Sequence, residues 1–105
     1  MTVIALLSVA PVTEESMAED VATAIEALDE FDVAYETNPM GTVIEADDID
    51  TLLAAVSAAH EAVEADRVST LLKIDDKRTE ERSAQAKVDD VEAILGRSAK
   101  RKRPD

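Results

Sequence analysis

The chain has 105 residues and no cysteine, and its 24 acidic and 11 basic side chains give a net charge of −13. This length predicts one domain with a modest core, so we expect any sizeable ligand site to be shared between subunits. Without cysteine there are no disulfides and no thiolate chemistry, and one histidine with carboxylates is a poor zinc site. The acidic surface repels nucleic acid and anionic membranes, so neither is an expected partner.

Acid excess together with 18 alanines, five lysines and two aromatic residues favours a halophilic cytoplasm, where a charged surface keeps a protein hydrated. An ordinary acidic protein is the alternative. The apolar segment from Thr2 to Val9 is short and has no basic leader, unlike a signal peptide. We therefore interpret it as a buried strand of a cytoplasmic protein.

The first predicted elements are a strand over residues 2–10 and a helix over about residues 14–30. The strand is apolar on both of its alternating faces, which is typical of a strand covered on both sides, and Pro11 ends it. Thr13 is the predicted helix N-cap. Apolar residues then recur at helical spacing and predict a helix lying on a sheet; they are Met17, Val21, Ala24, Ile25 and Leu28.

Residues 33–37 and 42–46 predict two antiparallel strands, which the turn Asn38-Pro39-Met40-Gly41 connects. Asp47 or Asp48 caps a second helix that ends near residue 66. Its predicted buried stripe consists of Ile49, Leu53, Val56, His60 and Val63. A last strand covers residues 67–75.

The order β-α-β-β-α-β predicts the α+β class and a ferredoxin-like sandwich, with the first strand between the third and the fourth. An added C-terminal helix over about residues 80–95 completes a domain of residues 1–96. Residues 97–105 are predicted to be a basic, disordered tail, with a nucleic-acid-binding arm as the alternative.

This topology leaves one sheet face without helices, although the first strand is apolar on both sides. Exposing Ile4 and Leu6 would cost on the order of a few kcal/mol per subunit. The sequence therefore predicts self-association through the sheets into a dimer or tetramer. Coverage of this face by the C-terminal helix alone is the alternative.

Several polar residues lie on or beside apolar strands, where a charge needs a partner or a ligand. Ser8, Glu45 and Lys73 are expected on neighbouring strands, with Glu45 binding an amine or cation and Tyr35 offering its ring to the same charge. An inert Glu45–Lys73 bridge between subunits is the alternative. We interpret His60 as a packed core histidine rather than a ligand.

No catalytic group stands out. The two glycines, Gly41 and Gly96, form no phosphate-binding loop, and no nucleophile has an evident adjacent base. These observations favour a protein that is not an enzyme, and they identify no metal site.

Three stretches resemble the thiamine-binding protein family of the MTH1187/YkoF-like group: residues 8–11, residues 35–45 and residues 67–78, with His60. The resemblance covers about residues 2–95 and implies a ferredoxin-like fold and assembly into dimers and tetramers. It implies binding of thiamine or its pyrimidine moiety without catalysis. The positions that match the family's polar motif are Ser8, Asn38, Met40, Thr42, Glu45 and Lys73.

The sequence therefore predicts a homo-oligomeric carrier or sensor of thiamine or a related hydroxymethylpyrimidine compound. We expect the site near the sheet-to-sheet interface, formed by Tyr35 and the six residues of the polar motif. Thiamine is the ligand, and no cofactor is expected. Two alternatives remain: a purely structural oligomer, and a small enzyme that acts on a thiamine-related compound.

Overall fold

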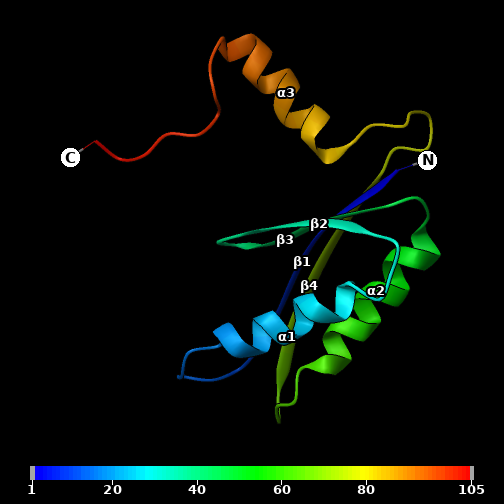
Figure 1. The fold of residues 1–105 in the computed structure, drawn as a ribbon, viewed down its shortest axis with the longest axis vertical. Coiled ribbons are helices and arrows are strands. Elements are labelled where there is room, and N and C mark those ends of the chain that lie inside the picture. Colours follow the sequence, from blue (N-terminus) through cyan, green and yellow to red (C-terminus); the bar gives the residue numbers. More distant parts are fainter. Residues whose placement is uncertain (1, 105) are drawn as a thin grey trace.

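A computed structural model describes residues 2–104 of the chain. Its elements are β1 (Val3–Pro11), α1 (Ala18–Leu28), β2 (Ala34–Asn38), β3 (Gly41–Ala46), α2 (Ile49–Ala62), β4 (Val68–Asp76) and α3 (Ala84–Leu95). The strands form one antiparallel sheet in the order β2-β3-β1-β4. Helices α1 and α2 cover one face, and α3 lies on the other side (Figure 1). The α+β ferredoxin-like fold and the position of β1 are as predicted.

β1 is one of the two inner strands, as its two apolar faces predict. Val3, Ala5, Leu7 and Val9 face the helices and are buried, whereas the alternate residues are half-buried on the opposite side. We call this opposite side the open face; its apolar residues are Ile4, Leu6, Ala10, Val43 and Leu71.

Helix α1 begins at Ala18, four residues later than predicted. Thr13 is not its N-cap, because the Thr13 hydroxyl accepts the N–H of Glu15 (3.2 Å) within the preceding loop. Met17 occupies the N-cap position without a side-chain hydrogen bond. The predicted inner stripe is correct from Val21 onward, since Ala24 and Leu28 are buried and Val21 and Ile25 are half-buried, but Met17 is 43% exposed and precedes the helix.

Helix α2 begins at the predicted cap. The Asp48 carboxylate accepts the N–H of Thr51 (2.7 Å) and its hydroxyl (3.0 Å), and these bonds hold the pKa of Asp48 below its usual range. The predicted buried stripe is wrong in three places, because Ile49 is 37% exposed, Leu53 is 45% exposed and His60 is exposed. His60 instead forms a hydrogen bond between its Nδ1 and the Thr70 hydroxyl (2.6 Å).

The face of α2 that is buried consists of Leu52, Ala55, Val56 and Ala59. Helix α2 packs against α1 as well as against β1 and β3. Leu52 is therefore in the core in place of Leu53, on the same side of the helix as the fully buried Ala55 and Ala59. A hydrophobic pattern alone did not distinguish these two adjacent leucines.

Helix α3 is well formed but buries no residue. Ser83 caps its start by accepting the N–H of Ala86 (3.1 Å), and Gly96 ends it in the left-handed conformation (φ 69°). The radius of gyration is 15.4 Å, whereas a compact chain of this length has about 13 Å. The excess arises because α3 and the segment after it extend away from the sandwich (Figure 1).

A candidate ligand-binding cavity

A cavity forms where β3 separates from β1. The two strands pair from Val3 to Leu7, but β1 continues to Pro11 with only β4 beside it. Successive residues of an antiparallel strand direct their peptide groups to alternate sides. At least one peptide N–H and C=O between Ser8 and Ala10 therefore points to the side that β3 has left.

Gly41 sets this separation, because β3 begins there in close contact with β1. A Cβ on Gly41 would lie 2.9 Å from Leu6 Cδ1 and 3.0 Å from the carbonyl oxygen of Leu7. A larger residue would push the β2–β3 hairpin away from β1. Glycine at this position thus fixes one wall of the cavity.

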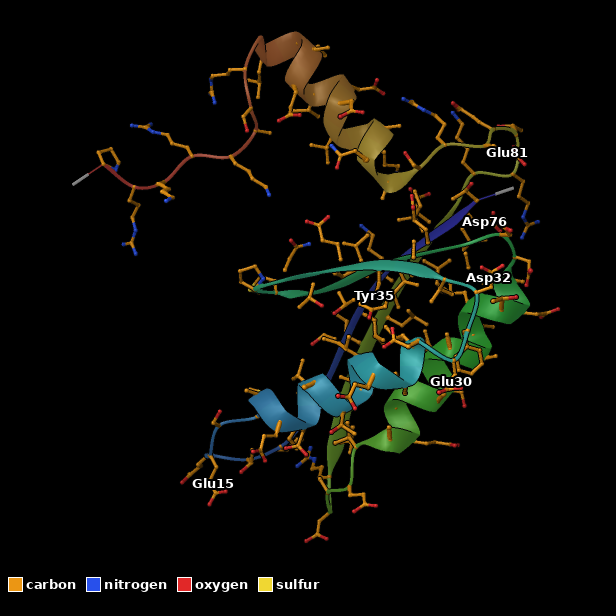
Figure 2. All side chains as sticks on the ribbon, in the orientation of Figure 1. Glu15, Glu30, Asp32, Tyr35, Asp76 and Glu81 are labelled. Atoms are coloured by element: carbon orange, nitrogen blue, oxygen red, sulfur yellow. The ribbon has the colours of Figure 1, made fainter. Side chains whose placement is uncertain are left out.

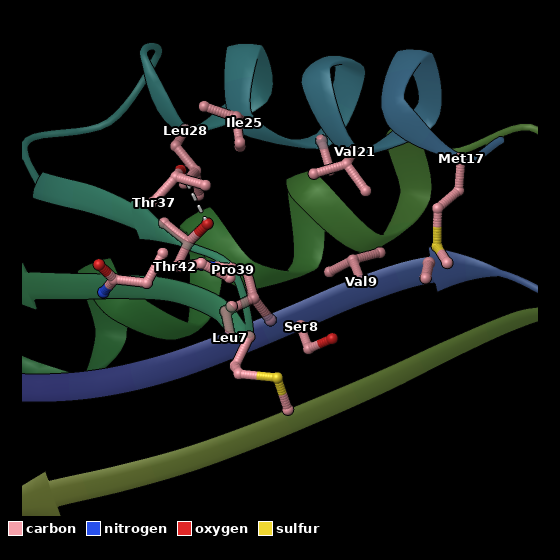
Figure 3. Close-up of a pocket in the computed structure, with 15 residues that line it drawn as sticks. Leu7, Ser8, Val9, Met17, Val21, Ile25, Leu28, Thr37, Pro39 and Thr42 are labelled. Atoms are coloured by element: carbon pink, nitrogen blue, oxygen red, sulfur yellow. Dashed lines mark hydrogen bonds between the residues drawn. The ribbon is translucent and has the colours of Figure 1, made fainter. Parts of the chain in front are cut away.

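The cavity has a volume of about 330 Å³ and lies between α1, the second half of β1 and the β2–β3 hairpin (Figure 3). This volume is at the lower end of the range for small-molecule pockets, about 300–1,000 Å³. Its lining residues are Leu7, Ser8, Val9, Ala10, Met17, Val21, Ala24, Ile25, Leu28, Thr37, Asn38, Pro39, Met40, Gly41 and Thr42.

The polar groups of the cavity lie on its strand side, opposite the apolar wall from α1. Thr42 is 5% exposed, and its hydroxyl lies 3.1 Å from that of Thr37. This pair uses one of its two hydroxyl protons, so the other can donate to a ligand. Within residues 2–104, the structure gives the side chains of Ser8 and Asn38 no hydrogen-bond partner. The cavity therefore offers several donors and acceptors on one side.

Four of the seven predicted site residues line this cavity: Ser8, Asn38, Met40 and Thr42. Met40 is 85% exposed at the hairpin turn and Met17 is 43% exposed at the start of α1, so the cavity lining includes two accessible methionines. The sequence identified Met17 only as a core residue. No local signal in the sequence separated Met17 from the core positions of the stripe, because it fits the same helical spacing as Val21 and Leu28.

Glu45 lies outside this cavity, half-buried on the open face beside Ile4. Its Oε1 accepts the N–H of Ala84 at the start of α3. A carboxylate at a helix N-terminus is stabilised by the free N–H groups and by the helix dipole. The unusual glutamate on an apolar strand therefore has a partner within the chain, which the sequence did not predict.

Tyr35 and Glu45 leave the sheet on opposite faces, since Tyr35 pairs with the buried Ile44 and Ala34 pairs with Glu45. Tyr35 lies on the helix side of the sheet (Figure 2). Its hydroxyl donates to Asp29 Oδ1 (2.6 Å), and this bond raises the pKa of Tyr35. Both residues touch a small hollow of about 160 Å³ at the β2 edge. That the Tyr35 ring and the Glu45 carboxylate contact the same ligand cation stays a prediction, and this hollow is the place where the two residues come together.

Lys73 lies beside Leu6 on the open face and is exposed. Among the described residues, no ion pair joins it to Glu45. As predicted, Ser8, Glu45 and Lys73 lie on three adjacent strands and share one face. Only Ser8 of these three reaches the cavity.

Within residues 2–104, no group of three or more histidine, aspartate or glutamate side chains is placed to hold a metal ion. None of the helices described there has the length and apolar character needed to span a membrane.

Three solved structures show the same fold. A hypothetical protein of Methanocaldococcus jannascii is 36% identical, with 86% of this chain and 95% of that one covered and a TM-score of 0.79. A domain of unknown function of Bacillus cereus is 28% identical, with coverage of 84% and 88% and a TM-score of 0.72. A Thermotoga maritima protein, described as a candidate thiamine biosynthesis/salvage protein, shares the fold at 24% identity, with coverage of 87% and 99% and a TM-score of 0.75.

Comparison with curated proteins gives no match. The family described as thiamine-binding protein, in contrast, matches residues 5–92, which include all the residues that line the cavity and every strand except Val3 and Ile4 of β1. The chain therefore belongs to the thiamine-binding protein family.

Proposed function

We propose that the chain binds thiamine, or a related hydroxymethylpyrimidine compound, without catalysis, in the cavity between α1 and the β2–β3 hairpin, and that it serves as a carrier or sensor. The observation that carries this proposal is the position of Ser8, Asn38, Met40 and Thr42. These residues come from two separate sequence segments, and they line one cavity of about 330 Å³.

The chemistry of the cavity suits one half of the ligand. An aminopyrimidine ring is flat and carries donors and acceptors on its edge. The α1 wall supplies apolar contact for the ring, and the free edge of β1 with Ser8, Asn38 and Thr42 supplies hydrogen-bonding groups. Methionine sulfur also packs favourably against aromatic rings, which gives Met40 a role in this site.

The thiazolium half of thiamine carries a permanent positive charge. The net charge of −13 attracts such a cation to the protein surface. Ser8 belongs to the open face, so the cavity extends toward the surface through which we propose that subunits associate. The site therefore lies close to the subunit interface.

Self-association is proposed because the open face remains apolar. Leu71 is 62% exposed there, and Ile4, Leu6 and Val43 are half-buried. Burial of one such side chain contributes roughly 1.5–3 kcal/mol. A second subunit over this face would remove several of these side chains from water.

The experiment is calorimetric titration with thiamine in high salt. We expect heat with the parent chain and weaker binding for Ser8→Ala and Asn38→Ala, each by up to roughly tenfold, because a typical hydrogen bond contributes about 0.5–1.5 kcal/mol. Glu45→Gln and Lys73→Ala are the matched variants on the open face. No heat with the parent chain would refute thiamine binding.

The same variants locate the site. Loss of heat with Glu45→Gln or Lys73→Ala, together with unchanged binding for Ser8→Ala and Asn38→Ala, would move the ligand out of the cavity onto the open face. Mass spectrometry of thiamine after long incubation tests the absence of catalysis, since a converted ligand would identify an enzyme.

A further inference from the structure

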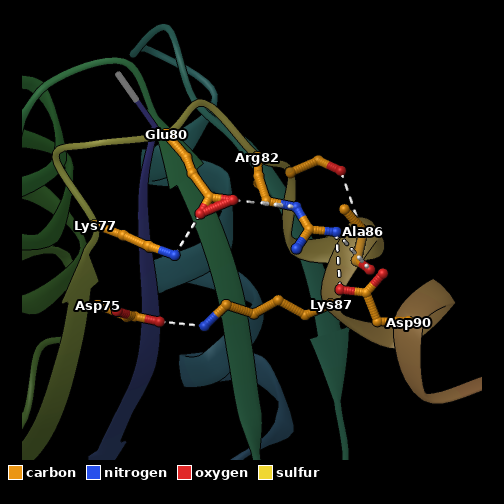
Figure 4. Close-up of polar contacts among 8 residues, drawn as sticks. Asp75, Lys77, Glu80, Arg82, Ala86, Lys87 and Asp90 are labelled. Atoms are coloured by element: carbon orange, nitrogen blue, oxygen red, sulfur yellow. Dashed lines mark hydrogen bonds and ion pairs between the residues drawn. The ribbon is translucent and has the colours of Figure 1, made fainter.

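Within residues 2–104, the polar contacts that join helix α3 to the sheet lie at its first turns. Besides the bond between Glu45 and Ala84, Lys87 forms an ion pair with Asp75, and Arg82 pairs with Asp90 (2.9 Å) and, more distantly, with Glu80 (3.9 Å) (Figure 4). Lys77 also pairs with Glu80. The start of α3 is therefore held by polar contacts on the open side of the sheet.

The rest of α3 presents an unpartnered apolar stripe. Val88, Val91 and Leu95 recur at positions i, i+3 and i+7, and they are 43%, 51% and 44% exposed. An isolated helix of 12 residues is marginally stable in water, and amphipathic helices obtain most of their stability from packing. Well-formed caps at both ends with no buried residue indicate a helix whose packing partner lies outside this subunit.

The stripe does not lie on the open face of its own sheet. Helix α3 starts next to the end of β4 and runs away from the sheet (Figure 1). Leu71 is the most exposed apolar residue of the open face, and it lies four residues back along β4 from Asp75, which is about 13 Å. The contacts at Glu45 and Asp75 hold the start of α3 away from that end.

Charge identifies a second copy of the chain as the partner. Residues 1–96 carry a charge of −17, whereas the segment after α3 contains five basic residues, Arg97, Lys100, Arg101, Lys102 and Arg103. A second copy offers a binding surface for each part: an uncovered apolar sheet face for the stripe of α3, and a strongly acidic surface for the basic segment.

We propose that α3 is an arm that packs its Val88–Val91–Leu95 stripe on the open face of a second copy, near Leu71 of that copy, and that the basic segment then contacts the acidic surface of the same copy. Because such an interface is isologous, each subunit supplies one arm and receives the other. This inference rests on the self-association proposed above and is independent of the ligand.

The natural absence of cysteine permits a direct test. Two single-cysteine chains, Leu71→Cys and Val91→Cys, one of them lengthened by a tag, are unfolded together, refolded and oxidised. We expect a disulfide-linked heterodimer, seen as the summed mass of the two chains on a non-reducing gel. Ala93→Cys, on the opposite side of α3, is the control and should give much less of this product with Leu71→Cys.

The other results would overturn the proposal. A heterodimer yield no greater than that of the Ala93→Cys control shows that α3 does not contact Leu71 of another copy. A disulfide within one chain of the double variant Leu71→Cys/Val91→Cys shows that α3 folds back on its own sheet.

The native mass of the parent chain, measured by light scattering, distinguishes failure of the α3 arm alone from failure of self-association. An oligomer without the heterodimer disulfide refutes the arm and leaves self-association standing. A monomer refutes both, whereas thiamine binding is decided separately by calorimetry.

Discussion

The close contact of Gly41 with β1 predicts a selective effect of one added methyl group. In Gly41→Ala the new Cβ would lie 2.9 Å from Leu6 Cδ1 and 3.0 Å from the backbone oxygen of Leu7. The leucine side chain can rotate, but the carbonyl belongs to the central strand and cannot move without disturbing its pairing. Overpacking of this kind costs typically 1–3 kcal/mol.

The added methyl group should push the β2–β3 hairpin away from β1. This displacement should weaken ligand binding, because Asn38, Pro39 and Met40 form one wall of the cavity together with Gly41. Loss of one hydrogen bond of about 1–1.5 kcal/mol corresponds to roughly tenfold weaker affinity. Chemical denaturation measures the stability, and calorimetry with thiamine in high salt measures the affinity.

Gly96→Ala is a matched control, because Gly96 is the only other glycine of the chain. Its φ of 69° makes alanine unfavourable by roughly 1–2 kcal/mol, yet nothing lies within 4 Å of the added Cβ. This variant should therefore lose comparable stability and keep the parent affinity. Equal affinity in Gly41→Ala and the parent, or equal loss in both variants, would refute the reasoning.

Three further predictions concern the helices, the anchor of α3 and the surface. Leu52→Ala should cost about 2–5 kcal/mol of unfolding free energy and Leu53→Ala well under half of that, because Leu52 is 0% and Leu53 45% exposed; equal losses by chemical denaturation would contradict the observed helix rotation. The hydrogen-bonded ion pair with Lys87 lowers the pKa of Asp75. The pair therefore stabilises the start of α3 fully above the ordinary aspartate pKa, and this stabilisation is lost as the pH falls through the lowered pKa of Asp75. The protection factor against amide exchange at the start of α3, which corrects the exchange rate for its intrinsic pH dependence, should fall over that acidic range in the parent and should already be lower at neutral pH in Asp75→Asn; a parent-like profile of protection in the variant would exclude this anchor. Removal of salt should lower the melting temperature, because screening weakens repulsion among the charges that sum to −13; a melting temperature independent of salt would contradict the halophilic interpretation.

Much of the fold followed from the sequence because hydrophobic periodicity reports directly on which faces are covered. Apolar residues on both faces of residues 2–10 required a central strand, and β1 is central. The Asn-Pro-Met-Gly turn required a hairpin between residues 37 and 42, and β2 and β3 pair across it. Asp48 provided the polar side chain that a helix N-terminus needs, and it caps α2.

Other features depended on contacts between segments that are distant in the sequence. Leu52 and Leu53 both fit a helical stripe, and only the packing of α1 against α2 decided which one is buried. The N–H of Ala84 is 39 residues from Glu45, so no local pattern could reveal that it is the partner of that carboxylate.

The candidate site shows the same division. The sequence named Ser8, Asn38, Met40 and Thr42 through family resemblance, but the cavity exists only because β3 leaves β1 after Leu7 while β1 continues beside β4. A sequence determines which residues prefer water or a core, because those preferences are local. The position at which two strands part depends on the register between them, and the tertiary structure alone sets that register.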